Sequence, residues 1–170
     1  KRQIETLESL GYAPIDLVCV NLYPFEATAS RNPPVTDSEL IEMIDIGGPT
    51  MIRSAAKNHQ DVLVVTSSEQ YPEVIESLSS TGGDPTKITH SLRSRLALRA
   101  FQRTAAYDAA VSSELDNRIM GEEVPTRVHI STDEGTSLRY GENPHQPAAF
   151  YPNAGEKTCL LYTSDAADDP

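Results

Sequence analysis

Two short apolar segments constrain the fold of this chain most strongly. The first, "IDLVCVNLY", spans residues 15–23 between two prolines, and the second, "DVLVVT", spans residues 61–66. Their length, their branched side chains and their lack of polar alternation are typical of strands buried on both faces of a parallel sheet. Cys19 lies within the first segment, so we expect it to belong to the core.

Helical patterns surround these two segments. Thr36 and Glu39 have the spacing of a capping box, and so do Ser67 and Gln70, so each pair predicts the start of a helix. The intervening sequence "EATASRNPPV" is typical of a loop. The helices expected from these signals span residues 1–10, 36–43, 50–57, 71–80 and 89–118.

The last of these helices carries apolar or small side chains at a period of 3.6 residues, which predicts one buried face. The stripe consists of Leu92, Leu96, Ala100, Thr104, Tyr107, Val111 and Leu115. Alternating strands and helices predict an α/β domain with a parallel sheet. Ligands of such sheets bind beyond the carboxyl ends of the strands.

The pattern weakens after Arg118. We interpret residues 119–135 as a linker and residues 136–157 as the opening of a second module, because "LRYGENPHQPAAFY" does not resemble core sequence. The sequence changes character again near its end, and residues 158–170 are expected to be a non-native tail. Because the first residue is lysine and not methionine, we expect a fragment that begins inside a domain.

Composition excludes several classes of function. The formal charge is −11, from 14 lysines and arginines against 25 acidic residues, which argues against a nucleic-acid surface. A hydrophobic share of 38% without any run near the ~20 apolar residues of a spanning helix argues against a membrane protein. Cys19 and Cys159 fit neither a disulfide framework nor a metal site, which favours a reducing compartment. A small anion still fits, because a few oriented amides and lysines can bind phosphate.

The pair Gly47-Gly48, followed by Pro49, precedes a helical segment. Its spacing matches neither a dinucleotide-binding loop nor a P-loop. Two interpretations remain open: a tight turn that allows close packing, or a helix entry whose free backbone amides and positive dipole end face a ligand.

Asp45 and Lys57 flank this helix. An acid and a lysine held in a partly dry pocket can exchange protons with a substrate near neutral pH. The alternative is a helix-capping aspartate and a surface lysine, because the helix between them separates the two side chains. His59 has no histidine or cysteine partner at metal-ligand spacing, so we expect no metal site.

Two further groups have polar and aromatic character. Asn21 and Tyr23 end the first strand, where they could bind a planar heterocycle; the alternative is that Tyr23 and Phe25 fix the loop to the core. Arg139, Tyr140, Asn143 and His145 form a denser set, for which the alternative is a solvated turn. The sequence contains no nucleophile elbow or Cys-His pairing that would indicate covalent catalysis.

Four motifs together resemble a known family: "NLYPF", "IDIGGPTMIRSAAKNH", "LALRAFQRTAAYD" and "LRYGENPHQ". They are similar, in order and over about residues 1–157, to the bifunctional purine-biosynthesis family that joins IMP cyclohydrolase to AICAR formyltransferase. The resemblance implies that residues 1–118 are the C-terminal part of a three-layer, methylglyoxal-synthase-like α/β domain. It also implies that residues 136–157 open the second α/β domain, the transformylase.

The resemblance assigns roles to individual residues. Lys57, Asp45 and Tyr23 match catalytic positions of the cyclohydrolase. The segment that holds the purine-like base matches Asp45, Ile46 and Gly47, and a second pair of base-contacting positions matches Val20 and Asn21. In the transformylase, the positions that bind the aminoimidazole carboxamide ribonucleotide match Arg139 and Tyr140.

The resemblance also implies an activity and its partners. The parent protein would be a cytoplasmic homodimer that acts on purine nucleotides, with 10-formyltetrahydrofolate as co-substrate of the transformylase and no cofactor or metal in the cyclohydrolase. The family's phosphate-binding segment, its folate site and most of its transformylase domain have no counterpart here, so we expect this fragment to be inactive. The alternative is a non-catalytic nucleotide-binding or regulatory module, a role in which methylglyoxal-synthase-like domains also serve.

Overall fold

The computed structural model describes residues 2–121, 124, 127–130, 132 and 135–152. The chain divides into two compact units, residues 1–124 and residues 125–170, which we describe separately.

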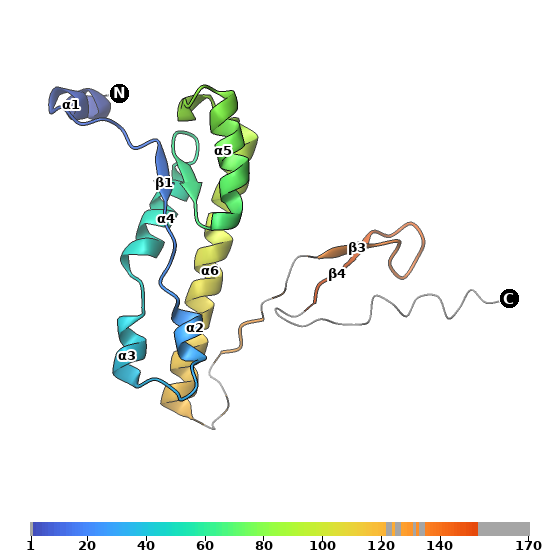
Figure 1. The fold of residues 1–170 in the computed structure, drawn as a ribbon. Helices are drawn as coiled ribbons and strands as arrows, with labels where there is room; N and C mark the ends of the chain where they lie inside the picture. Colours follow the sequence, from blue (N-terminus) through green and yellow to red (C-terminus); the bar gives the residue numbers. More distant parts are fainter. Residues whose placement is uncertain (1, 122–123, 125–126, 131, 133–134, 153–170) are drawn as a thin grey trace. The chain divides into compact units, whose positions relative to one another are not determined.

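The first unit contains most of the regular structure (Figure 1). Its elements are, in order, α1 (Arg2–Ser9), β1 (Leu17–Cys19), α2 (Phe25–Ala29), α3 (Asp37–Glu42), α4 (Gly47–Lys57), β2 (Leu63–Val65), the 3-10 turn η1 (Ser68–Gln70), α5 (Tyr71–Ser80), the 3-10 turn η2 (Pro85–Lys87) and α6 (His90–Met120).

Strands β1 and β2 form a parallel pair, with Leu17 opposite Leu63 and Cys19 opposite Val65. The connection between them contains α2, α3 and α4, as parallel strands require a long crossover. The expectation of an α/β fold with parallel strands is therefore confirmed.

Helix α6 packs against α4 and β2 to form the main core. Strand β2 is buried along its whole length, as predicted. Between the two helices, Ala55, Ala56, Ala97 and Ala100 are buried, and their small side chains allow the helix backbones to approach closely. The stripe predicted on α6 is buried from Leu92 to Tyr107 and partly buried beyond it.

A second, smaller core forms where Phe25 and Leu40 pack against Tyr107 of α6. The Phe25 and Tyr107 rings meet edge to face with centroids 6.2 Å apart. Arg118, at the end of α6, ties the same region together: its guanidinium donates to Glu114 Oε1 (2.7 Å), to the Val35 carbonyl (3.1 Å) and to Asp37 Oδ1 (2.7 Å).

The first strand differs from its prediction. Leu17 and Cys19 are exposed and only Val18 between them is partly buried, so the expectation of a strand buried on both faces, and of Cys19 in the core, was wrong. The physical reason is that β1 pairs with β2 alone among the described strands of this unit. Leu17 and Cys19 point to the same face of this edge strand and are exposed there, whereas Val18 points to the opposite face and packs against the main core.

Local sequence signals predicted the start of some helices correctly and missed the start of others. The Thr36 capping box is present in both directions, since Thr36 Oγ1 accepts from the Glu39 amide and Glu39 Oε2 accepts from the Thr36 amide. The expected loop at residues 26–35 instead begins with helix α2, whose glutamate and two alanines favour a helix and whose Phe25 and Thr28 are buried. Helix α4 starts three residues before its prediction, so that Gly47 and Gly48 form its first turn.

In the second unit, β3 (Thr136–Leu138) and β4 (Ala148–Phe150) form an antiparallel hairpin, with Thr136 opposite Phe150. The tail expected at residues 158–170, including Cys159, lies outside the described residues. Across the part of the chain that the structure describes, no helix has the length and apolar character needed to cross a membrane.

Truncation of a core side chain on α6 should destabilise the first unit far more than truncation of a surface one. Leu96 is 1% exposed, so we expect Leu96→Ala to lower the free energy of unfolding by about 2–5 kcal/mol. Leu98, two residues away and 59% exposed, provides the matched control, with an expected change within about 0.5 kcal/mol. Urea denaturation measures both, and equal losses would contradict the assignment of the buried face.

Candidate functional site

The candidate site centres on Asp45, which lies in the loop before α4. Asp45 Oδ1 accepts a hydrogen bond from the Gly48 amide (2.7 Å), and Asp45 Oδ2 accepts one from the Tyr23 amide (3.2 Å). The carboxylate therefore satisfies a free amide at the start of α4 and joins this helix to the loop that follows β1. Of the two sequence interpretations, helix capping is the one that these contacts display.

The Tyr107 hydroxyl fixes the position of the Asp45 main chain. The Asp45 amide donates to the Tyr107 hydroxyl (2.7 Å), and this hydroxyl in turn donates to the Met43 carbonyl (3.3 Å). The phenol is protonated at neutral pH and so can donate, and burial raises the pKa of Tyr107 further. The sequence placed Tyr107 in the core stripe of α6 and gave no sign of this second role.

Gly48 is closely packed against neighbouring side chains, whereas Gly47 has free space around it. A Cβ atom on Gly48 would lie 2.5 Å from Asp45 Oδ2 and 2.8 Å from Leu22 Cδ2, whereas a Cβ on Gly47 would meet nothing within 4 Å. Gly48 therefore permits the close approach of the carboxylate to the helix start. Gly47 leaves its backbone accessible.

Two large side chains beside this helix start face solvent. The Tyr23 side chain is 56% exposed, and the Ile46 side chain is 74% exposed. The Tyr23 side chain therefore does not fix the loop to the core, whereas Phe25, which is 1% exposed, does. The exposed Tyr23 ring offers a planar ligand a stacking surface, and the accessible backbone at Gly47 offers hydrogen-bonding groups.

The other predicted base-contacting pair lies just beyond β1. Val20 donates its amide to the Val65 carbonyl (3.0 Å), extending the strand pairing, and the Asn21 side chain is exposed. Tyr71, which sequence reasoning did not single out, interacts with Asn21 and accepts a hydrogen bond from the Cys19 thiol (3.6 Å). The contact with Cys19 is the main reason that the pKa of Tyr71 is raised.

Lys57 lies at the opposite end of α4 from Asp45. The helix has 11 residues, which corresponds to a rise of about 15 Å. Lys57 is exposed in the last turn, where its charge complements the negative end of the helix dipole. Within this chain the structure thus groups Asp45, Tyr23 and Gly48, and it does not bring Lys57 to them.

Arg139 and Tyr140 lie in the loop of the β3–β4 hairpin and are exposed. The loop is closed by a hydrogen bond from the Gly141 amide to the Gln146 carbonyl (2.8 Å) and by one from the Asn143 amide to Gln146 Oε1 (3.1 Å). The solvated turn that the sequence left open is present, with both candidate side chains projecting from it.

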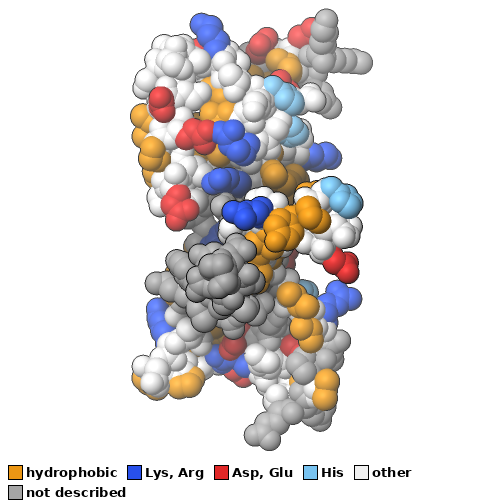
Figure 2. All heavy atoms as spheres, turned by 90° about the vertical axis from the view of Figure 1, so that its right-hand side faces the viewer, with side chains coloured by type: hydrophobic (Ala, Val, Ile, Leu, Met, Phe, Trp, Pro, Cys, Tyr) orange, Lys and Arg blue, Asp and Glu red, His pale blue; other side chains and the backbone are white. Residues whose placement is uncertain are grey.

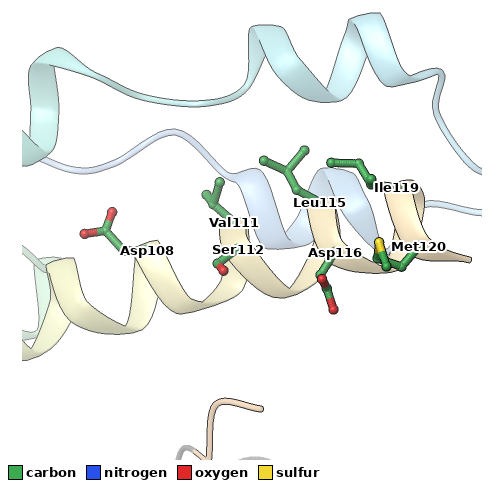
Figure 3. Close-up of a pocket in the computed structure, with 7 residues that line it drawn as sticks. All are labelled: Asp108, Val111, Ser112, Leu115, Asp116, Ile119 and Met120. Carbon is green, nitrogen blue, oxygen red and sulfur yellow. The ribbon is translucent and has the colours of Figure 1, made fainter. Parts of the chain in front are cut away.

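A hollow of about 460 Å³ runs along the C-terminal half of α6. All seven lining residues come from this helix, and Val111, Leu115 and Ile119 form its apolar side (Figure 3). None of the predicted site residues lines it, so this cavity does not coincide with the candidate site. Within the described ranges, no three or more histidine, cysteine or acidic side chains are grouped where they could hold one metal ion.

Alanine at the two adjacent glycines should have opposite effects on stability. Gly48→Ala would displace the Asp45 carboxylate from its two amide donors, and we expect a loss of about 1–3 kcal/mol in the free energy of unfolding. Gly47→Ala has free space and should be neutral or stabilising by up to about 1 kcal/mol. Parallel urea denaturation of both variants checks this, and a similar loss at both positions would refute the close packing at Gly48.

Removal of the Tyr107 hydroxyl should destabilise the chain in a pH-dependent way. Tyr107→Phe leaves the Asp45 amide and the Met43 carbonyl without their buried partner, which should cost about 1–3 kcal/mol at neutral pH. Because the folded-state pKa is raised, the unfolded chain ionises first as pH rises above about 10, and the stabilisation is then lost.

The difference in unfolding free energy between the unmodified chain and Tyr107→Phe should therefore shrink above about pH 10. Tyr12→Phe, at a tyrosine that is 64% exposed, is the control and should change stability by less than about 0.5 kcal/mol. A difference that is constant with pH would contradict the role of the buried phenol.

Comparison with known proteins gives these residues a context. The chain is 45% identical over 161 residues to the bifunctional purine biosynthesis protein PurH of Rhodopirellula baltica, covering 95% of this chain and 30% of that protein. It is 50% identical over 151 residues to PurH of Bradyrhizobium diazoefficiens, covering 89% of this chain and 27% of that protein. The chain thus spans less than a third of the length of these relatives.

A solved structure shares the fold. The crystal structure of ForH aligns with a TM-score of 0.55 at 33% sequence identity, over 68% of this chain and 57% of that one. The family model described as "AICARFT/IMPCHase bienzyme" matches residues 55–166. This chain belongs to the AICARFT/IMPCHase bienzyme family.

Proposed function

We propose that this chain carries the base-side portion of the cyclohydrolase site of a bifunctional, cytoplasmic enzyme of purine synthesis. The complete enzyme would transfer a formyl group from 10-formyltetrahydrofolate to AICAR and then close the ring of the formylated product to give IMP and water. Membership of the family is the observation that carries this proposal. The chain spans only part of its relatives, so the fragment alone is expected to be inactive.

The finer architecture follows from the same proposal. Residues 1–118 would form the C-terminal part of a three-layer, methylglyoxal-synthase-like domain, residues 119–135 a linker, and residues 136–157 the start of the transformylase domain. Residues 158–170 would not belong to the native sequence. The parallel β1–β2 pair, flanked by α4 and α6, is compatible with the first assignment.

The start of α4 would hold the purine-like base. The accessible backbone at Gly47 and the exposed faces of Tyr23 and Ile46 supply hydrogen-bonding and stacking surfaces. Val20 and Asn21 would contact the base from the end of β1. The Asp45 carboxylate is held in a fixed orientation by two amides, as a group that must act on one defined atom has to be.

Ring closure makes clear demands on these groups. The carboxamide nitrogen attacks the formyl carbon, a carbon–nitrogen bond forms, and the former formyl oxygen leaves as water. The attacking amide is a poor nucleophile and the oxygen gains negative charge. A carboxylate that accepts the amide proton and a lysine or oriented amides that stabilise or protonate the oxygen would each help.

Asp45 and Lys57 are our candidates for these two roles, with Tyr23 beside Asp45, and the length of α4 separates Asp45 from Lys57 within one chain. In the homodimer that we propose for the complete enzyme, a lysine from the partner subunit offers one way to complete the site. In the transformylase half, the exposed Arg139 and Tyr140 would bind the ribonucleotide substrate.

The same separation favours one alternative, a nucleotide-binding or regulatory module without turnover. Titration of the complete protein with its nucleotide product tests binding, and the ring-closure assay tests turnover. Tight binding without turnover would support the alternative.

Substitution of either proposed catalytic residue should slow ring closure in the full-length enzyme. We expect Lys57→Ala and Asp45→Asn each to lower kcat by about 10²- to 10⁴-fold, the usual contribution of general acid–base catalysis. The absorbance change on IMP formation measures the rate, and Lys87→Ala on the η2 turn is the control that should leave it unchanged. Unchanged turnover in Lys57→Ala would refute its catalytic role.

Mixing the two inactive variants tests how the site is shared. If Lys57 acts across subunits, dimers that contain one variant chain of each kind regain one intact site, and ring closure should partly recover. If both residues act within one subunit, dimers mixed in this way have no intact site and stay inactive.

A further inference from the structure

Two histidines that are 31 residues apart in the sequence lie side by side in the first unit. His59 follows the end of α4, and His90 is the first residue of α6. Their ring centroids are 5.8 Å apart and their planes are inclined by 55°. The His90 side chain is exposed and the His59 side chain is partly buried. Figure 2 shows histidine side chains (pale blue) on the surface of the molecule.

Hydrogen bonds occupy the same nitrogen on each ring. His59 Nδ1 lies 3.0 Å from the Ala56 carbonyl oxygen, which can only accept, so this nitrogen carries the proton. His90 Nδ1 lies 3.3 Å from the Ser94 hydroxyl, which can accept its proton in the same way. With the proton on Nδ1 of both rings, each Nε2 carries a lone pair. Histidines that ligate metals show this pattern, in which the second nitrogen donates to an outer partner that orients the ring.

The separation of the rings also suits a shared ion. Imidazole nitrogens bind zinc at about 2.0–2.1 Å, which puts the centroids of two rings on one ion roughly 5–6 Å apart. The observed separation of 5.8 Å lies in this range.

We propose that His59 and His90 form a binding site for one divalent transition-metal ion of the class that prefers imidazole, namely Zn²⁺, Ni²⁺ or Cu²⁺. Water fills the remaining coordination positions, since the described side chains provide no third histidine, cysteine or carboxylate nearby. The ion cross-links the end of α4 to the start of α6. This site is independent of the proposed ring-closing chemistry.

The test is titration of the whole chain with Ni²⁺ alone, in a buffer that does not bind metals, followed by calorimetry and thermal melting. We expect one Ni²⁺ ion per chain and a higher melting temperature, because an ion that binds the folded state stabilises it. Cu²⁺ should bind more tightly than Ni²⁺. Mg²⁺ should give no binding, because it prefers oxygen ligands.

Variants locate the ion. His59→Ala and His90→Ala should each weaken Ni²⁺ binding by at least about tenfold, and Ser94→Ala should weaken it by about tenfold through loss of ring orientation. His145→Ala, in the hairpin loop, is the matched control and should bind as the unmodified chain does. Unchanged binding in either of the first two variants, or an equal loss in His145→Ala, would overturn the proposal.

A second measurement needs no variant and so does not depend on variant folding. Paramagnetic Cu²⁺ added to the unmodified chain should first broaden the imidazole NMR signals of His59 and His90. Signals from His129 or His145 that broaden first, or no selective broadening at all, would also overturn the proposal.

Discussion

The buried face of α6 is the constraint on which the first unit depends. Its N-terminal half packs against α4 and β2, and its middle contributes Tyr107 to the second core around Phe25 and Leu40. One helix therefore supports the strand pair and the crossover segment at the same time. Because interiors are close-packed, a change in its buried residues would be felt in both cores.

The candidate site is an extension of this packing. Tyr107 is 2% exposed and belongs to the second core, yet its hydroxyl fixes the Asp45 main chain. The Asp45 carboxylate then fixes both the loop after β1 and the first turn of α4. The groups that we assign to base binding are thus positioned by a rigid helix and a buried phenol, although they lie on loops and at a helix end. Contacts of this kind with the rigid core are what the precise orientation of a reacting group requires.

Local sequence signals predicted the helices and the second strand well, because capping boxes and a 3.6-residue period act within a few residues. They failed at β1 and at α2, where burial depends on partners that are distant in sequence. Cys19 illustrates this: its apolar neighbours in the sequence predicted a core position, but it lies on the face of β1 that is exposed. For the same reason the sequence suggested Asp45 and Gly47 but could not show that Tyr107 supports Asp45, or that His90 lies next to His59.

The contacts of Arg118 show that the last turns of α6 are needed for the packing of the first unit. A single guanidinium near the last turn of α6 binds the Asp37 carboxylate and the Val35 carbonyl at the entrance to α3. The last turns of the helix are therefore not a dispensable extension of it. A shortened version of the unit that stops before residue 118 would release the start of α3 from α6, whereas one that retains Arg118 would preserve the closing contact between the end of the unit and its crossover segment.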